Sequence, residues 1–299
     1  MDEYFVGVDA GGTKTELRVI SPHRLTVERV RLPGFNYQSG NLKEFVKDIR
    51  NTLDRIKKDH RLERYGFMVA GVAGVFLPYE KEKVAMVLEE LTGIKTRVMS
   101  DMEILLYGTW DGEPGMVLIA GTGSIAAALL SDGKVVRKGG YGYIIGDIGS
   151  GAWFGLNAVR AALNSFEGLG PKTILQDEVF KFFGAGSPRE LIGKFYAEKD
   201  KPGLLGKLFP IILDSYFKGD AVSEKILEEG MEGLVNMLRV IREETDVIPR
   251  VLLSGGLFKN SSFHRMFIKK LKGFSVEMLG SEPSYLAAKL ALKFYQESK

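Results

Sequence analysis

The chain has 299 residues, of which 45% are hydrophobic and 26% charged, and its net charge of +3 is too small to indicate a nucleic-acid partner. It contains no cysteine, which excludes disulfides, thiolate metal sites and cysteine-ligated iron–sulfur clusters. No apolar run is long enough to span a bilayer, and the acidic start "MDEYFVGVDA" lacks the positive charge of a signal peptide, so we expect a cytoplasmic protein without a membrane partner.

The first part of the chain predicts an α/β domain that opens with a β-hairpin. The segment "VGVDAGGTKTELRVI" (6–20) has the pattern of a strand, a glycine-rich turn and a second strand. The elements expected after it are a strand at 25–32, a loop at 33–40, a helix from Asn41, a strand at 65–74, a helix at 79–92, a strand at 96–99 and a short helix at 101–107.

The second part repeats this plan, beginning with the similar segment "VLIAGTGSIAAALL" (117–130). The breaker cluster "DGEPG" (111–115) predicts a boundary between domains 1–113 and 114–299, with the last helix (284–299) able to pack back on the first domain. The elements expected here are a turn at 131–134, a glycine-rich segment at 139–155, helices at 152–164 and throughout 173–244, a strand at 250–256, a helix at 261–272, a strand at 274–279 and a helix at 284–296.

The turn of the first hairpin is a candidate phosphate site. Gly11, Gly12 and Thr13 allow backbone N–H groups and one hydroxyl to point together at an anion, and glycine tolerates the positive φ that such a turn can need. Asp9 cannot bind phosphate directly, but beside a phosphate it could anchor a hydrated Mg²⁺. An ordinary hairpin turn is the alternative for a single copy.

The second hairpin makes the phosphate interpretation the stronger one. Its turn carries Gly121, Thr122, Gly123 and Ser124 after a buried strand. Two anion-binding turns, one in each domain, could face each other across a cleft and hold a polyphosphate from both sides.

Several motifs together resemble the superfamily of actin, sugar kinases and heat-shock ATPases. They are similar to its N-acetylglucosamine kinase branch, which includes the BadF/BadG/BcrA/BcrD ATPases. The resemblance implies two ribonuclease-H-like, actin-like ATPase domains of class α/β with an interdomain cleft, the first binding sugar and phosphate and the second nucleotide. The matching segments are "DAGGTKT", "SDMEILLYG", "IAGTGS", "GGYGYIIGDIGSG" and "LLSGGLFKN".

"SDMEILLYG" is similar to the segment that carries the catalytic aspartate of these kinases, which implies that Asp101 is the general base. Asp101 follows an apolar strand and begins a helix, and open α/β sheets bind ligands at this strand end. There it could accept the proton of a sugar hydroxyl that attacks the γ-phosphate. A helix N-cap is the alternative role.

The glycine-rich signature and an earlier loop are implied to contact the sugar through Asn36, Asp147 and the backbone of Gly140, Tyr141 and Gly142. The alternatives are a turn-forming asparagine for Asn36 and an Asx-turn for Asp147. Many relatives have Glu after this aspartate, whereas this chain has Ile148.

The remaining motif residues are assigned to the nucleotide. Lys14 belongs to the first phosphate motif, Gly255 and Gly256 could lie against adenine or ribose, and Asn260 could bind the purine edge. The alternative for Gly255 and Gly256 is that they only allow a strand to pack on a helix.

The resemblance implies an ATP- and Mg²⁺-dependent kinase that phosphorylates the 6-hydroxyl of N-acetylglucosamine and works as a homodimer. Glucosamine or a range of hexoses are alternative acceptors, because these sugars differ at one substituent. Two other functions are a nucleotide-dependent regulator and a BadF-type ATPase, which needs cysteines for its iron–sulfur cluster and is therefore disfavoured.

Overall fold

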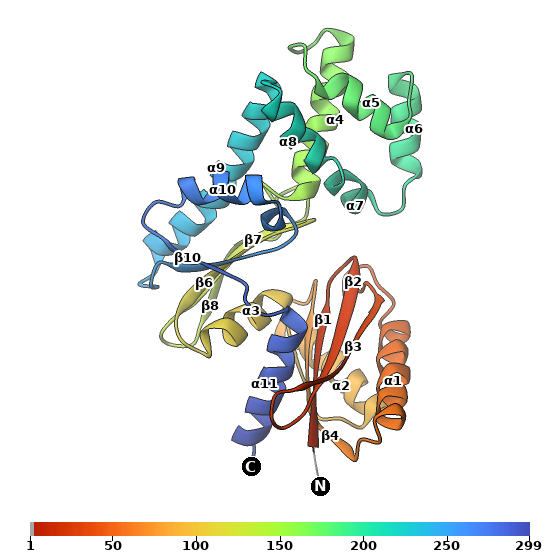
Figure 1. The fold of residues 1–299 in the computed structure, drawn as a ribbon, viewed down its shortest axis with the longest axis vertical. Coiled ribbons are helices and arrows are strands. Elements are labelled where there is room, and N and C mark those ends of the chain that lie inside the picture. Colours follow the sequence, from red (N-terminus) through yellow and green to blue (C-terminus); the bar gives the residue numbers. More distant parts are fainter. Residues whose placement is uncertain (1–2) are drawn as a thin grey trace. The chain divides into compact units, whose positions relative to one another are not determined.

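The computed structural model describes residues 3–299, which form two compact units (Figure 1). Unit 1 runs up to Glu113 and resumes at Leu279, and unit 2 runs from Pro114 to Met278. The chain therefore leaves unit 1 inside the breaker cluster 111–115 and returns to it for its last helix. None of the helices in the described part of the chain is long and apolar enough to cross a membrane.

Unit 1 is built on a five-stranded sheet of order β3-β2-β1-β4-β5. Strands β1, β2 and β3 are antiparallel, whereas β1, β4 and β5 are parallel. The elements are β1 (Glu3–Ala10), β2 (Lys14–Ile20), β3 (Thr26–Pro33), α1 (Leu42–Asp59), β4 (Arg64–Val72), α2 (Pro78–Thr92), β5 (Thr96–Met99), α3 (Asp101–Trp110) and α11 (Pro283–Glu297).

The alternation of β1 decides which helices cover each face of this sheet. Val6, Val8 and Ala10 point into a core shared with α1 and α2. Gly7 points to the other face, where a Cβ would lie only 2.1 Å from the Ser284 carbonyl oxygen of α11. Gly71 of β4 faces α3 in the same way, so α3 and α11 cover the face onto which Asp9 also projects.

Unit 2 repeats the same plan in its sheet, of order β10-β9-β6-β7-β8. Strand β6 pairs antiparallel with β7 and parallel with β9, just as β1 pairs with β2 and β4. The elements are β6 (Gly115–Ala120), β7 (Ser124–Leu129), β8 (Val135–Gly139), α4 (Gly151–Glu167), α5 (Leu175–Phe183), α6 (Pro188–Ala197), α7 (Lys201–Gly206), α8 (Phe209–Phe217), α9 (Ala221–Glu244), β9 (Arg250–Ser254), η1 (Leu257–Lys259), α10 (Ser261–Lys270) and β10 (Ser275–Met278).

The predicted elements are confirmed in kind and order, apart from the unpredicted short helix η1, and two helices, α3 and α4, each run three residues past their predicted ends. Helix α3 continues three residues past Tyr107, to Trp110, and is closed by Asp111 in the left-handed conformation. The predicted stop of α2 at Gly93 is confirmed, since Gly93 has a φ of 69° and its N–H bonds to the Glu89 carbonyl.

Candidate active site

The turn between β1 and β2 has exposed backbone and is held by hydrogen bonds at its base. The Gly11 N–H bonds to the Lys14 carbonyl at 3.0 Å, and the Gly11 carbonyl accepts the N–H of Phe35 at 2.9 Å. Gly12, Thr13 and Lys14 are exposed. The loop that fixes the turn comes so close that a Cβ on Gly34 would lie 2.5 Å from the Gly12 carbonyl oxygen.

The expected reason for the turn glycines is wrong. Neither Gly11 and Gly12 nor Gly121 and Gly123 have a positive φ. A Cβ on Gly12 would also meet no atom within 4 Å, so neither backbone strain nor internal packing requires glycine there. Close approach of a ligand to the backbone remains as a physical reason.

Asp9 and Asp101 lie at the same edge of the unit 1 sheet. Burial, followed by the negative charge of Asp101, raises the pKa of Asp9 to about 7. Burial also raises the pKa of Asp101, although the Met102 N–H, which donates to its Oδ1 at 2.9 Å, opposes the shift. Two carboxylates therefore share one poorly solvated region after β1 and β5.

This pair of carboxylates fits a divalent cation. The Asp9 carboxylate makes no hydrogen bond or ion pair with any residue in 3–299. Mg²⁺ is usually held by one or two carboxylates together with waters and substrate phosphates, so one free carboxylate beside a phosphate-binding turn is a suitable donor set. No cluster of three or more metal-binding side chains occurs among the described residues.

Asp101 is not the cap of its helix, so the alternative role considered for it is wrong. Ser100 is the N-cap of α3, and its Oγ accepts the N–H of Glu103 at 3.2 Å. Glu103 returns the contact through Oε2, which accepts the N–H of Ser100 at 2.8 Å. Asp101 stands at the first helical position, where the helix dipole favours its ionised form.

A lysine of α2 reinforces this capping box. Lys81 Nζ lies 2.7 and 2.6 Å from the two carboxylate oxygens of Glu103. Both side chains are largely buried, with 24% and 17% of their surfaces exposed. The first turn of α3, and with it Asp101, is thereby tied to α2. The sequence pattern Ser100-x-x-Glu103 could have revealed the cap, but Lys81 is too distant in sequence to be found this way.

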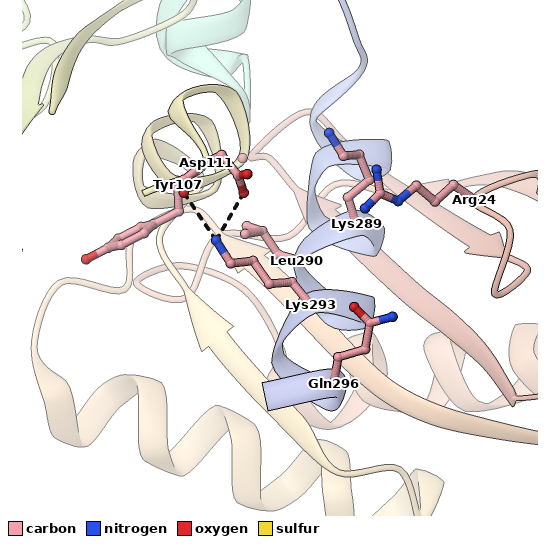
Figure 2. A pocket seen from close by; sticks show the side chains of 8 residues that line it. Arg24, Tyr107, Asp111, Lys289, Leu290, Lys293 and Gln296 are labelled. Carbon is pink, nitrogen blue, oxygen red and sulfur yellow. Dashed lines mark hydrogen bonds and ion pairs between the residues drawn. The ribbon is translucent and has the colours of Figure 1, made fainter. Parts of the chain in front are cut away.

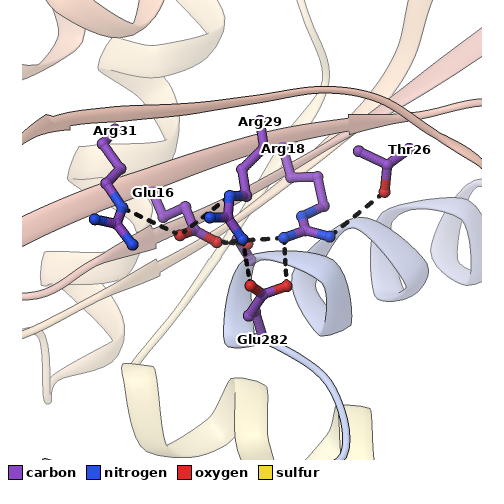
Figure 3. A network of polar contacts seen from close by, with 7 residues as sticks. Glu16, Arg18, Thr26, Arg29, Arg31 and Glu282 are labelled. Atoms are coloured by element: carbon purple, nitrogen blue, oxygen red, sulfur yellow. Dashed lines mark hydrogen bonds and ion pairs between the residues drawn. The ribbon is translucent and has the colours of Figure 1, made fainter.

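A charged network borders Asp9 on the neighbouring strand (Figure 3). Glu16 pairs with Asp9 across the two strands and is buried, 3.5 Å from Arg18 and in contact with the hydroxyl of Ser284. Arg18 and Arg29 both bind Glu282, at the start of α11. These ion pairs fix the returning chain to the sheet beside Asp9, and none of these charges was singled out from the sequence.

Asn36 lies at the same sheet edge as Asp9 and Asp101. It forms a parallel β-bridge with Ala73, directly after β4. Its Oδ1 accepts the N–H of Gln38 at 2.9 Å, which confirms the turn-forming role considered for it. Its Nδ2 makes no hydrogen bond in the described structure, so a contact from this group to a ligand stays a prediction.

In unit 2, three glycine-rich segments meet at the turn between β6 and β7. The Gly121 carbonyl accepts the N–H of Gly151 at 2.7 Å, and the Thr122 carbonyl accepts that of Ala152 at 3.2 Å. The first turn of α4 therefore lies against this hairpin, and helix N-termini favour anions. Gly255 reaches the same place, since a Cβ on it would lie 2.3 Å from the Ala120 carbonyl oxygen.

Asp147 holds the glycine-rich signature together. It is buried, with 8% of its surface exposed, and its Oδ1 accepts the N–H of Gly142 at 3.1 Å. Burial raises its pKa, while the N–H groups of Gly142, Tyr141 and Ser124 oppose the shift. Because its partner lies five residues earlier and not two residues later, the Asx-turn alternative is wrong. Contacts of Gly140 and Asp147 with sugar stay predictions.

The glycine pair and Asn260 in the last motif have different surroundings. Gly255 has a φ of 106°, and a Cβ on it would meet the backbone of Ala120 in β6, so it is strand-to-strand contact and not the expected packing of a strand on a helix that requires glycine there. Gly256 is exposed with open space around it. Asn260 is the N-cap of α10, and its Oδ1 accepts the N–H groups of Ser262 and Phe263 at 3.0 and 3.1 Å. A purine contact could therefore use only its Nδ2.

Ile148 packs within unit 2. A Cβ on Gly233 of α9 would lie 2.3 Å from Ile148 Cγ2, so this side chain covers the helix backbone closely. The Ile148 carbonyl accepts the hydroxyl of Ser124 at 2.9 Å. Where many relatives have Glu, the Ile148 side chain thus contacts α9 with 47% of the residue exposed, and the bond to β7 uses only its backbone.

Comparisons with known proteins agree with this arrangement. The sequence pattern of the BadF/BadG/BcrA/BcrD ATPase family matches residues 6–285. The N-acetylmuramic acid/N-acetylglucosamine kinase of Clostridium acetobutylicum is 30% identical over 269 residues, which cover 87% of each chain.

Two solved structures share the fold over nearly the whole chain. One, from Chromobacterium violaceum and provisionally named an N-acetylglucosamine kinase, has a TM-score of 0.80 at 23% identity and covers 96% of this chain and 98% of its own. A ROK family glucokinase from Streptomyces griseus in complex with glucose and AMPPNP has a TM-score of 0.60 at 15% identity and covers 97% and 99%. The predicted fold class is thereby confirmed.

Proposed function

Because the chain belongs to the BadF/BadG/BcrA/BcrD ATPase family, we propose that it is an ATP-dependent sugar kinase. The reaction transfers the γ-phosphoryl group to the 6-hydroxyl of an amino sugar or hexose, with N-acetylglucosamine as the first candidate. The observation that carries the proposal is the pair Asp9 and Asp101 at one sheet edge, with an unpaired carboxylate for a cation and a second one for a proton.

The two hairpin turns bind the phosphates of ATP. In unit 1 the donors are the exposed backbone of Gly11 and Gly12, with Thr13 and Lys14. In unit 2 they are Gly121, Thr122 and Gly123, beside the N-terminus of α4. Gly255, Gly256 and Asn260 contact the nucleoside. Such fixed N–H donors stabilise the charge that spreads over the transferred group.

Asp9 would hold Mg²⁺ through water. When bound, the ion neutralises charge on the β- and γ-phosphates of ATP. Asp9 is suited to this role because its carboxylate is left without a partner and is held against Asp101 by the sheet and α3. A cation beside Asp9 opposes protonation of its carboxylate at neutral pH.

Asp101 orients the sugar and receives its proton. As the bond from O6 to phosphorus forms and the bond from phosphorus to the ADP oxygen breaks, the O6 proton passes to the Asp101 carboxylate. A raised pKa makes this carboxylate a better proton acceptor than an exposed aspartate. The Ser100–Glu103 cap and Lys81 keep it in place. Asn36, Asp147 and the Gly140–Gly142 backbone bind the sugar.

N-acetylmuramic acid is a second candidate acceptor. The Clostridium acetobutylicum relative is named for both sugars. In this chain the Arg137 guanidinium lies over the Tyr141 ring, 5.5 Å from its centroid, at the loop proposed to bind the sugar. A guanidinium there suits the carboxylate that distinguishes muramic acid from glucosamine.

A sugar panel tests the proposal. ADP release is measured with N-acetylglucosamine, N-acetylmuramic acid, glucosamine, glucose and no sugar, and kcat/KM is compared. Stimulation by an amino sugar or hexose is the expected result. ADP release that no sugar changes would contradict the kinase and favour an ATPase or regulator, although the BadF-type electron-transfer role lacks the cysteines it needs.

Two further expectations concern the protein in its cell. A homodimer is expected from the resemblance to the kinase branch, and light scattering at several concentrations tests it. A cytoplasmic location is expected because ATP is the phosphoryl donor, and fractionation of the producing cell tests that.

A further inference from the structure

A pocket of about 240 Å³ opens on unit 1 (Figure 2), at the end of β2 opposite the turn between β1 and β2. It lies where the C-terminal end of α3 meets α11 and the turn between β2 and β3. Its lining residues are Tyr107 of α3, Asp111 directly after that helix, Lys289 and Lys293 of α11, and Arg24 of the turn. Asp101 begins the same helix α3, about 15 Å away at a rise of 1.5 Å per residue, so the pocket is separate from the proposed active site.

The charges around this pocket are not balanced. Lys293 Nζ is held by Asp111, at 3.0 Å from Oδ1 and 3.1 Å from the carbonyl oxygen. The side chains of Arg24 and Lys289 make no hydrogen bond or ion pair with any residue from 3 to 299. Three cations thus surround the pocket with one carboxylate, which is already paired with Lys293.

The fold brings these like charges together and keeps them there. Lys289 and Lys293 are four residues apart on α11, a spacing at which like charges destabilise a helix. Lys289 is half-buried beside the buried side chain of Leu290, so it has limited freedom to turn away. In Figure 2 the Arg24 side chain extends along α11 towards Lys289.

The turn that carries Arg24 is fixed before any ligand binds. The N–H of Arg24 bonds to the Ser21 carbonyl at 2.9 Å, and the Ser21 N–H bonds to the Leu25 carbonyl at 2.8 Å. Arg24 itself has a φ of 64°, which is unusual for a residue other than glycine. The Tyr285 hydroxyl donates to the Arg24 carbonyl at 3.2 Å and so attaches the turn to α11.

We propose that this pocket binds a small phosphate monoester, with the phosphate between Arg24 and Lys289. Two cations without counter-charges match a dianion, and a guanidinium can bind phosphate oxygens through two parallel hydrogen bonds. The carbon chain of a small ester would lie against the Tyr107 ring, which lines the same pocket.

The test is calorimetric titration of the full chain with glycerol 3-phosphate and, separately, with inorganic phosphate and malonate. The pocket variant is Arg24→Gln/Lys289→Gln. Its control is Lys43→Gln/Lys47→Gln, which removes the same charge from exposed positions four residues apart on α1. Circular dichroism checks that each variant folds, and the single variant Lys289→Gln gives a second, milder change. Gly12→Ala checks that binding does not occur at the first hairpin turn.

The proposal predicts that glycerol 3-phosphate binds the wild type, the control and Gly12→Ala with equal affinity. Binding is expected to be at least tenfold weaker in the double variant and intermediate in Lys289→Gln. Inorganic phosphate should compete for the site more weakly than the ester, because it lacks the carbon chain that contacts the Tyr107 ring. Equal affinity in the wild type and the double variant, an equal loss in the control, or malonate binding as tightly as the ester would each overturn the proposal.

Discussion

Nothing inside the chain requires glycine at position 12, since its φ is ordinary and a Cβ would meet open space. We therefore predict that Gly12→Ala leaves the melting temperature unchanged but weakens ATP binding at least tenfold, because the methyl group occupies space needed by a phosphate. Calorimetric titration with ATP measures the effect. Gly193→Ala, at another unhindered glycine in α6, is the control and should bind ATP normally. Unchanged ATP affinity in Gly12→Ala would contradict the phosphate role of this turn.

Asp101 is expected to reduce stability at neutral pH. Burial raises the pKa of Asp101 in the folded state above the ordinary value of about 3.9. The folded protein therefore favours the protonated carboxyl group, and the resulting stabilisation is fully present below the ordinary value. It is lost as the pH rises through the folded-state pKa. Asp101→Asn should therefore raise the melting temperature at pH 7 to 8, and the difference from wild type should shrink towards pH 4. Melting curves from pH 4 to 8 test this. A difference that does not change with pH would contradict it.

At this scale the sequence predicted where candidate residues lie better than what they touch. Asp9 and Asp101 were chosen partly from their positions at strand ends and Asn36 from the resemblance, and the structure places all three at one sheet edge. Asn260 and Asp147 were expected to face ligands, yet their oxygens accept backbone N–H groups of the protein. Such partners depend on loop geometry, which residue type alone does not determine.

At the scale of elements, the contact between α2 and the start of α3 is the feature with functional consequences. Lys81→Met should leave Glu103 without its partner, cost about 1 kcal/mol of stability and lower kcat roughly tenfold through misplacement of Asp101. The KM for ATP should stay the same. Lys134→Met is the matched control, because it removes a lysine whose pair with Asp132 is exposed. An unchanged kcat in Lys81→Met would show that the cap does not position the base.

Helices and strands were predictable where local chemistry marks their ends. Gly93 ends α2, as its sequence position indicates. Asn41 likewise caps α1, and its side chain accepts the N–H of Glu44. Helix α3 was predicted too short because Gly108, directly after Tyr107, has the appearance of a helix end, whereas it lies inside the helix. Its missing side chain serves packing instead, since a Cβ would lie 2.7 Å from Leu286 of α11. That contact joins residues far apart in sequence and could not be predicted from local pattern.

At the scale of the whole molecule, the two units share the same sheet topology. Each sheet has a central strand with a hairpin on one side and parallel strands on the other. The repeated hairpin sequence predicted this, because each copy begins its unit. The ion pairs from Arg18 and Arg29 to Glu282 were not predictable, since they attach the chain where it returns to unit 1 after the whole of unit 2.

Turnover by Asp101→Asn tests the central claim most directly. ADP release with a saturating acceptor from the sugar panel is compared between wild type and variant, and ATP binding is measured by calorimetry. We predict a fall in kcat of about 10²- to 10⁴-fold, as expected for loss of a general base, with ATP affinity within about threefold of wild type. Near-normal turnover by the folded variant would contradict the assignment of Asp101 as the group that accepts the sugar's proton.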